Sequence, residues 1–296
     1  MKKSECDLSC VSDEKFEKKY QEIKEKITDE MTPVDKPIAV VLGGQPGAGK
    51  STIYKIYGEQ FGGNIVALDC DAFRQYHPNF KELHKVYGDN DGEKTNPFIF
   101  RVVDRLVDKL SEEGYNMIIE SSLKSPHTAI ENGEKLPKKG YSVELAVMAT
   151  PKSESWNGTL ERYNSVKASG GQPRAVPKEF HDMVVANIAN SISEVYQSGL
   201  MSNILIFNRN KECLYDMSKT PDINPSKLLD DIINREQYIF KEISIDELDE
   251  HKNELSGLCQ VGKSSDDVAV LKFKGSDKEK IEDILSNNQK LSKAMK

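Results

Sequence analysis

One short stretch, LGGQPGAGKST over residues 42–52, gathers the residue types that bind a polyphosphate. Gly44 to Ser51 fit the phosphate-loop pattern G-x-x-x-x-G-K-[ST]. In such a loop backbone N–H groups converge on the phosphates, the lysine reaches the β and γ oxygens, and the final hydroxyl holds Mg²⁺. An apolar run precedes the loop and a helical pattern follows it, which is the context that the loop requires. We therefore expect a nucleoside triphosphate to bind at Gly44, Gln45, Pro46, Gly47, Ala48, Gly49, Lys50, Ser51 and Thr52.

The rest of the chain does not favour a GTPase switch. Such a switch needs D-x-x-G after a strand and N/T-K-x-D for the guanine base. The chain has only DNDG over residues 89–92, inside a polar loop, and NKEC over residues 210–213, which lacks the final Asp. We predict ATP or GTP together with Mg²⁺ as the cofactors, used in a different reaction.

Acidic residues follow two other apolar runs. Asp69 and Asp71 stand in VALDCD, and Glu120 ends MIIE. Ligands of open α/β sheets bind at the carboxyl ends of the strands, and phosphoryl transfer to a hydroxyl needs a carboxylate that accepts the proton. We predict Asp71 as this base and Glu120 with Ser51 as the Mg²⁺ site. Asp69 either anchors the turn or holds a metal-bound water.

Two arginines could balance charge on the transferred group. Arg162 in LERYN and Arg174 in GQPRAVP lie at a predicted helix end and in the loop beyond it. Lids that bring arginines to a γ-phosphate commonly occupy such places. Spacing alone nevertheless favours two solvated arginines.

The elements that must position these residues are short apolar runs alternating with helical patterns. The runs are IAVVL from residue 38, NIVAL from 64, NMIIE from 116, SVELAVMA from 142 and NILIF from 203. Apolar residues recur at helical spacing over residues 16–31, 98–110 and 180–195. Alternating strands and helices predict an α/β fold, specifically a P-loop kinase-like, mostly parallel sheet with helices on both faces.

Composition bounds the remaining possibilities. A net charge of −7 over 296 residues argues against a nucleic-acid partner, and no apolar run reaches the length of a membrane span. Without an apolar signal segment near its start, the chain is expected in the cytoplasm. Five scattered cysteines do not suggest a disulfide framework. We predict a kinase domain over residues 1–233 and a C-terminal extension of unknown role over 234–296, either a small packing element or partly disordered.

Several segments, in order and at similar spacing, resemble the zeta toxin family, the toxins of bacterial epsilon–zeta toxin–antitoxin pairs. They are LGGQPGAGKST, LDCDAFRQYHPNF, GYNMIIESS, LAVMATPKSES, TLERYN and PRAVPKEFHDMVVANI, between about residues 16 and 214. The resemblance implies a kinase that phosphorylates a nucleotide sugar, typically UDP-N-acetylglucosamine at the 3′-hydroxyl of its amino sugar. It also implies a small helical antitoxin as the partner.

The family's functional residues map onto this sequence position by position. Lys50 and Ser51 match the phosphate loop, Asp71 the proton acceptor, and Arg162 and Arg174 the two arginines near the γ-phosphate. RQYHPNF from residue 74 then corresponds to a wall of the substrate site, with His77 a structural member rather than a base. The residues implied on the substrate side are Asp71, Phe73, His77, Asp104, Glu120, Ser122 and Lys124.

Two departures leave the acceptor open. Asp104 stands where the family has a glutamate, and SSLK over residues 121–124 replaces the common G-T-G-R, so Lys124 provides a point charge instead of a planar guanidinium. The alternative acceptors are another UDP sugar, a dinucleotide or a nucleoside. A further alternative is a catalytically weak nucleotide-binding protein that serves mainly as a partner.

Overall fold

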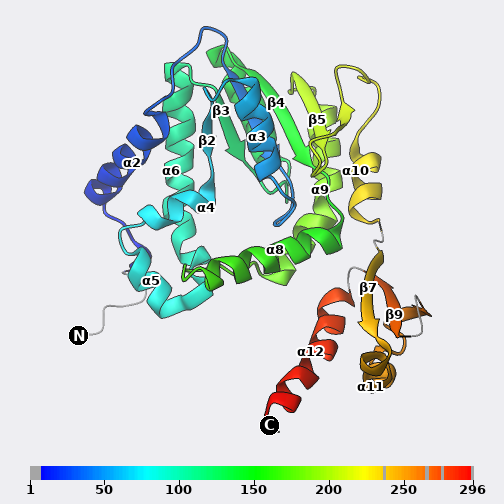
Figure 1. The fold of residues 1–296 in the computed structure, drawn as a ribbon. Helices are drawn as coiled ribbons and strands as arrows, with labels where there is room; N and C mark the ends of the chain where they lie inside the picture. The colour runs from blue at the N-terminus through cyan, green and yellow to red at the C-terminus, as the bar shows by residue number, and fades with distance from the viewer. Residues whose placement is uncertain (1–7, 236–237, 264–266, 275–276, 295–296) are drawn as a thin grey trace. The chain divides into compact units, whose positions relative to one another are not determined.

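A computed structural model describes residues 8–235, 238–263, 267–274 and 277–294 (Figure 1). The chain divides into two compact units. The first comprises Met1–Thr150 and Ser155–Ile233, and the second comprises Pro151–Glu154 and Asn234–Lys296.

The first unit is built on a six-stranded sheet in the order β2-β3-β1-β4-β5-β6. Strands β1 to β5 are parallel, and β6 pairs antiparallel with β5. The bounds are β1 (Ile38–Gly43), β2 (Val66–Leu68), β3 (Met117–Glu120), β4 (Ser142–Met148), β5 (Asn203–Phe207) and β6 (Cys213–Asp216). The predicted α/β fold and its five strands are confirmed, while the edge strand β6 was not predicted.

Helices cover both faces of this sheet, as β1 illustrates. Ala39 and Val41 pack in one hydrophobic cluster, whereas Val40 and Leu42 pack in another with Ile53 of α3. A strand buried on both faces reads as a continuous apolar run, which is why β1 was recognisable. The helices are α2 (Asp13–Thr28), α3 (Ser51–Gln60), α4 (Cys70–Phe73), α5 (Phe80–Tyr87), α6 (Gly92–Glu113), α7 (His127–Lys135), α8 (Lys152–Ala168), α9 (Lys178–Ser198) and α10 (Ser226–Ile233), with 3-10 turns at Arg74–Tyr76, Gly88–Asn90 and Leu136–Lys139.

The predicted helical stripes correspond to α2, α6 and α9. In α2, Phe16, Tyr20 and Ile23 are buried, and the Oγ of Ser12 caps its start by accepting from the N–H of Lys15. The helix ends at Thr28, before the last residue of the predicted stripe.

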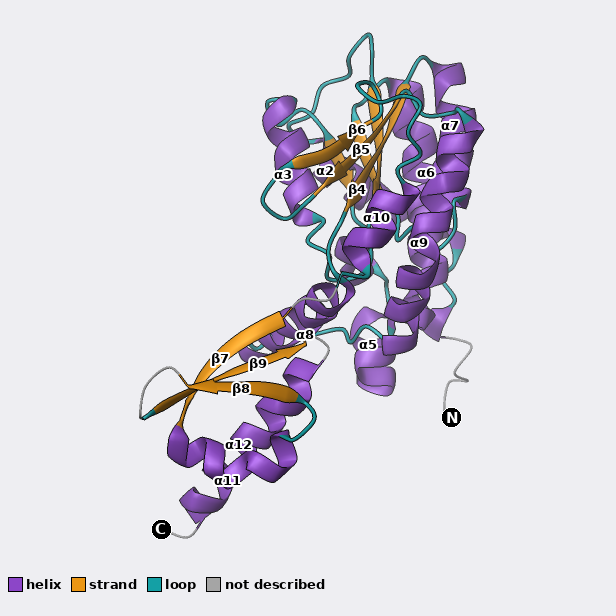
Figure 2. Cartoon of the chain, turned by 90° about the vertical axis from the view of Figure 1, so that its right-hand side faces the viewer, coloured by secondary structure: helices purple, strands orange, loops and turns teal. Residues whose placement is uncertain are grey.

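The second unit has its own sheet and core (Figure 2). It contains β7 (Tyr238–Ser244), α11 (Ile245–Leu255), β8 (Cys259–Lys263), β9 (Val268–Lys274) and α12 (Lys278–Ala294), with the antiparallel order β7-β9-β8. Leu255 of α11, Leu271 and Phe273 of β9, and Ile281 of α12 form its apolar centre. In the sequence, the run VAVLKF from residue 268 indicates a strand and KEKIEDILSNNQKLSKAM from residue 278 indicates an amphipathic helix, and these two elements are β9 and α12.

Within the described residues, no helix is both long and apolar enough to cross a membrane. Of the cysteines in that part of the chain, Cys10, Cys70, Cys213 and Cys259 are free thiols, and Cys6 lies outside it.

Candidate active site

The phosphate-loop segment connects β1 to α3, which begins at Ser51. Its backbone turns through positive φ angles at Gly44, Gly47 and Gly49. At Gly47 the reason is also steric, because a Cβ there would collide with the backbone of Ser155 and Thr159 in α8. The loop therefore packs directly against α8, and only glycine fits at this contact.

Buried polar side chains hold the outside of the loop. Gln45 is fully buried, and its Nε2 donates to the carbonyl of Thr150 (2.6 Å) and to the Oγ of Ser155 (3.3 Å). The Thr150 hydroxyl donates to the Ala48 carbonyl at 2.7 Å. Ser155 Oγ also lies 2.9 Å from His181 Nε2, and burial lowers the pKa of this histidine. The loop is thus tied to the end of β4 and to α8 and α9.

Lys50 and Glu120 meet at the carboxyl edge of the sheet, because β1 and β3 are neighbours and Leu42 pairs with Glu120. Lys50 Nζ lies 3.1 Å from Glu120 Oε1 and donates to the Gly44 carbonyl at 3.2 Å. The Tyr54 hydroxyl donates to Glu120 Oε2 at 3.1 Å. Burial and then the Glu120 charge raise the pKa of Tyr54, so this tyrosine stays a neutral donor.

This edge suits Mg²⁺. The ion prefers oxygen ligands and usually takes one or two carboxylates, waters and the substrate's phosphates instead of an all-protein cage. The Glu120 carboxylate and the hydroxyl of Ser51, which follows Lys50, are donors of this kind. No group of three or more His, Cys, Asp or Glu able to hold a metal occurs among the described residues.

Asp71 lies on the short helix α4 that follows β2, and Asp69 immediately precedes this helix. Asp69 Oδ1 accepts from the N–H groups of Asp71 (2.8 Å) and Ala72 (3.3 Å), so Asp69 caps the helix. Burial and then the nearby Glu120 charge raise the pKa of Asp69. Of the two roles considered for Asp69, the structure contains the turn anchor.

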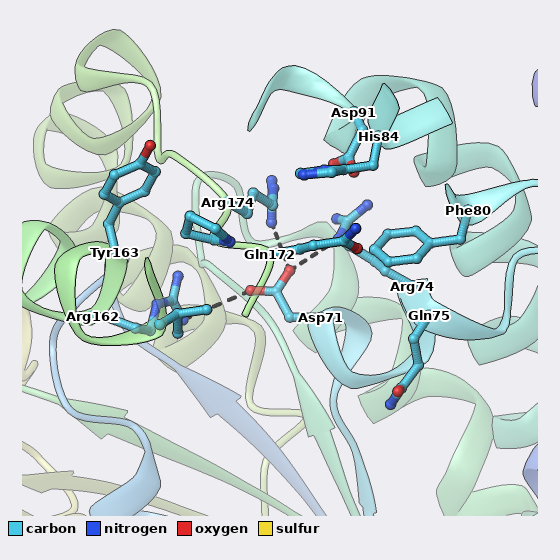
Figure 3. A pocket seen from close by; sticks show the side chains of 12 residues that line it. Asp71, Arg74, Gln75, Phe80, His84, Asp91, Arg162, Tyr163, Gln172 and Arg174 are labelled. Carbon is cyan, nitrogen blue, oxygen red and sulfur yellow. Dashed lines mark hydrogen bonds and ion pairs between the residues drawn. The ribbon is translucent and has the colours of Figure 1, made fainter. Parts of the chain in front are cut away.

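Asp71 lies among three arginines (Figure 3). Its Oδ1 accepts from Arg174 Nη1 at 2.6 Å and from Arg74 Nε at 3.1 Å, and its Oδ2 lies 3.8 Å from Arg162 Nη1. Burial acts to raise the pKa of Asp71, but Arg174, Arg74 and Arg162 together outweigh it, so the net pKa lies below the ordinary value. The sequence-predicted base and both predicted γ-phosphate arginines are therefore in contact.

The motifs in the sequence assigned no individual role to Arg74. Its guanidinium is buried and donates to Asp71, to the Gly92 carbonyl (3.0 Å), to Thr95 Oγ1 (2.5 Å) and to Asn96 Oδ1 (2.8 Å). Arg74 thereby fixes Asp71 to the start of α6. Its place three residues after Asp71 on one helical turn was the available signal.

A cavity of about 340 Å³ opens beside Asp71. In Figure 3, α4, α5 and the start of α6 form one wall, and α8 with its following loop forms the other. Within the wall, Asp91 is buried and its Oδ2 lies 3.1 Å from His84 Nδ1. The lining residues are Asp71, Arg74, Gln75, Phe80, His84, Asp91, Arg162, Tyr163, Val166, Gln172, Pro173 and Arg174.

The other predicted substrate-side residues do not line this cavity. Phe73 and His77 are buried, and the His77 ring packs edge-on against Phe98 with the ring centroids 5.1 Å apart. Asp104 lies exposed on α6. Ser122 and Lys124 lie in the loop between β3 and α7, where Ser122 Oγ accepts from the Lys124 N–H.

Comparison with known proteins identifies the family. The Zeta toxin family matches residues 21–220. Toxin zeta of Streptococcus pyogenes is 36% identical over 225 residues, which cover 76% of this chain and 78% of that protein. Toxin PezT of Streptococcus pneumoniae is 38% identical over 199 residues, covering 67% and 78%. The chain belongs to the zeta toxin family.

Solved structures agree with this assignment. A structure of the PezAT chromosomal toxin–antitoxin system of Streptococcus pneumoniae matches with a TM-score of 0.70 and 32% identity, over 76% of this chain and 89% of that one. A structure of the AvrRxo1-ORF1:-ORF2 complex matches with a TM-score of 0.51 and 15% identity, over 74% and 72%, and shows the shared fold alone. The family resemblance read from the motifs is confirmed, and residues 234–296 lie beyond the family match.

Proposed function

We propose that this zeta toxin family member is a phosphotransferase that uses ATP or GTP to phosphorylate the 3′-hydroxyl of the amino sugar of UDP-N-acetylglucosamine. The observation that carries the proposal is the contact of Asp71 with Arg162 and Arg174 at the edge of a cavity. A carboxylate that accepts a hydroxyl proton and cations that balance charge on a phosphoryl group are the two requirements of this chemistry. Here they share one site.

The resting contacts suggest how the site works. In the structure Arg174 and Arg162 contact Asp71, and together with Arg74 they lower its pKa and keep its carboxylate ionised. An incoming γ-phosphate is a stronger partner for these arginines, because it carries more charge and several acceptor oxygens. As the arginines turn to the phosphate, Asp71 becomes free to accept the proton of the acceptor hydroxyl, while Arg74 keeps it in place. The attacking oxygen then forms the new bond to phosphorus as the bond to the nucleoside diphosphate breaks.

Lys50 supports the other end of the transferred group. In this proposal it leaves Glu120 for the β and γ oxygens, as phosphate-loop lysines do. Ser51 and Glu120 would hold Mg²⁺, which supplies charge neutralisation between the β and γ phosphates.

The cavity limits how the acceptor binds. Its 340 Å³ is near the lower end of the roughly 300–1,000 Å³ typical of ligand pockets, so it suits a sugar-sized group rather than a whole nucleotide sugar. We assign the reacting sugar to the cavity, where Gln172 offers an amide group for its hydroxyls. The rest of the acceptor would extend toward Asp104, Ser122 and Lys124.

The proposal also covers action as a toxin and inhibition by an antitoxin. The relatives are called toxins, and the PezAT structure is described as a toxin–antitoxin system. We propose that this chain is likewise the toxin of such a pair and that a small helical antitoxin covers its nucleotide site with acidic side chains that imitate phosphates.

The test is phosphoryl transfer by the purified full chain from ATP or GTP with Mg²⁺. The acceptors are UDP-N-acetylglucosamine, UDP-glucose, a nucleoside and a dinucleotide, and products are identified by mass spectrometry. Transfer only to UDP-N-acetylglucosamine is expected. Transfer to another acceptor would contradict the proposed substrate but support the proposed phosphoryl transfer. Failure of Lys50→Ala to remove growth arrest in cells would show that toxicity does not depend on phosphoryl transfer.

A further inference from the structure

Arg209 lies directly beyond β5 and reaches the outside of the phosphate loop. Its Nη2 donates to the carbonyl of Gly47 at 2.5 Å, and its Nε donates to the carbonyl of Ala48 at 3.2 Å. One planar guanidinium thus binds two successive carbonyls of the loop. A fork of this kind fixes direction as well as distance, which a single ammonium group does not.

The contact with the Ala48 carbonyl determines where the next N–H group of the loop points. The Ala48 carbonyl accepts from Arg209 on one side and from the Thr150 hydroxyl at 2.7 Å. In a trans peptide the C=O and the following N–H point in opposite directions. Holding the Ala48 carbonyl outward therefore turns the Gly49 N–H inward, toward the space that a phosphate would occupy.

Close packing restricts the movement of the Arg209 side chain. The stem of Arg209 lies against Gly49, where an added Cβ would meet Arg209 Cγ at 3.3 Å. On α8, an added Cβ at Gly158 would come within 2.7 Å of the Gly47 carbonyl and 3.0 Å of Arg209 Nη2. The guanidinium is therefore held between the loop and α8, with no room for a side chain at Gly158 and a tight fit for one at Gly49.

We propose that Arg209 is a positioning residue that sets the phosphate loop in its binding shape before the nucleotide arrives. Arg209 acts through the loop's backbone and does not itself need to touch the phosphates. Its positive charge behind the loop adds to the attraction for them. The proposal rests on the proposed nucleotide-dependent function, since the loop's shape matters only if a polyphosphate binds there.

The principal test replaces Arg209 with Met, which keeps the apolar stem and removes both donors. A positional error of about 1 Å in a catalytic site can cost roughly 100-fold in rate, so we expect kcat/KM for the nucleotide to fall between 10- and 100-fold. The acceptor KM should change less than twofold. Lys211→Met is the matched control, because Lys211 lies two residues away and binds Glu59 at 2.7 Å instead of the loop. It should remain within twofold of the parent.

A second readout separates positioning from general destabilisation. ADP places its β-phosphate in such a loop and AMP does not, so Arg209→Met should lower the affinity ratio of ADP to AMP about tenfold. Arg209→Lys should recover only part of the loss, because one ammonium cannot hold both carbonyls. Gly158→Ala should cause a similar loss by displacing the guanidinium, although alanine itself favours a helix.

Amide hydrogen exchange of residues 44–50 tests the inference without any reaction. In the nucleotide-free full chain, Arg209→Met should speed exchange of the Ala48 amide, which donates to the Gln45 carbonyl at 3.1 Å, at least tenfold, whereas Lys211→Met should not. Unchanged exchange, or equal losses of ADP and AMP affinity, would overturn the role of Arg209. If the parent protein binds no nucleotide, the proposed function fails, and the exchange experiment still decides whether Arg209 shapes the loop.

Discussion

Replacing Asp71 with Asn should have opposite effects on binding and on transfer. The amide keeps the size of the side chain but cannot accept the hydroxyl proton. General-base catalysis contributes about 10²–10⁴-fold, so kcat should fall by that factor, equivalent to roughly 2.7–5.4 kcal/mol of barrier. Nucleotide binding should survive, because the phosphate loop and Lys50 are untouched.

The contacts of Asp71 with Arg174 and Arg162 predict that nucleotide binding will improve in Asp71→Asn. Arg174 and Arg162 must leave Asp71 before they can bind a γ-phosphate. The side chains of Asp71, Arg174 and Arg162 are 43%, 32% and 53% exposed, so each ion pair is worth no more than about 1 kcal/mol. Losing this competition should tighten binding of a non-hydrolysable triphosphate by about two- to fivefold.

Calorimetry with this analogue and a single-turnover assay measure the two effects. Asp108→Asn, on the exposed surface at the far end of α6, is the control and should alter neither. Transfer within tenfold of the parent would remove Asp71 from the role of base. Weaker nucleotide binding in Asp71→Asn would refute the idea that Asp71 and the phosphate compete for the same arginines.

Four further predictions concern Asp69, Arg74, the titration of Asp71, and Lys124. Asp69→Ala should lower the free energy of unfolding in urea by about 1 kcal/mol through loss of the helix cap, whereas Asp69→Asn should not; equal losses would contradict the capping role. Arg74→Met should destabilise the protein by about 3 kcal/mol or more in thermal unfolding, since it leaves buried acceptors unpaired; a loss under 1 kcal/mol would contradict this. Because the pKa of Asp71 lies below its ordinary value of 3.8, the carboxylate stays ionised throughout the range from pH 7 to 5. The profile of kcat/KM against pH should therefore show no loss of activity from Asp71 in that range. An acid limb there that Asp71→Asn abolishes would contradict the lowered pKa. Lys124→Arg should change the ranking of kcat/KM among UDP sugars. An unchanged ranking would show that Lys124 does not contact the acceptor.

The parts of the fold that could be predicted are those whose side chains carry a strong local pattern. Strands β1 to β5 were recognised because parallel strands buried on both faces leave short apolar runs. The phosphate loop was recognised because its glycines and Lys50 have fixed spacing. Strand β6 and the second unit's β7, β8 and α11 escaped, because their apolar residues stand singly or in short runs beside polar and charged residues, as in CLYD of β6 and YIFKEIS of β7.

The same distinction applies to the site. Lys50, Asp71, Arg162 and Arg174 could be named from motifs and from family resemblance. The buried supports could not, because their role consists of contacts across the fold. Arg74 binds the start of α6, and Arg209 binds a loop about 160 positions earlier in the chain. Spacing in the sequence pairs Arg74 with Asp71, but it does not reveal the Gly92, Thr95 and Asn96 acceptors of Arg74 or the loop carbonyls that Arg209 binds.

Helix α8 connects the two halves of the proposed reaction. Gly158 lies against the Gly47 carbonyl of the phosphate loop, and Arg162 reaches toward Asp71 from the same helix. Four residues of α-helix span about 6 Å and slightly more than one turn, so both contacts come from nearly the same face. A rigid helix with one glycine against the donor's loop and one arginine beside the acceptor's base fixes the distance between them. The exclusion of a side chain at Gly158 thus bears on phosphoryl transfer as well as on packing.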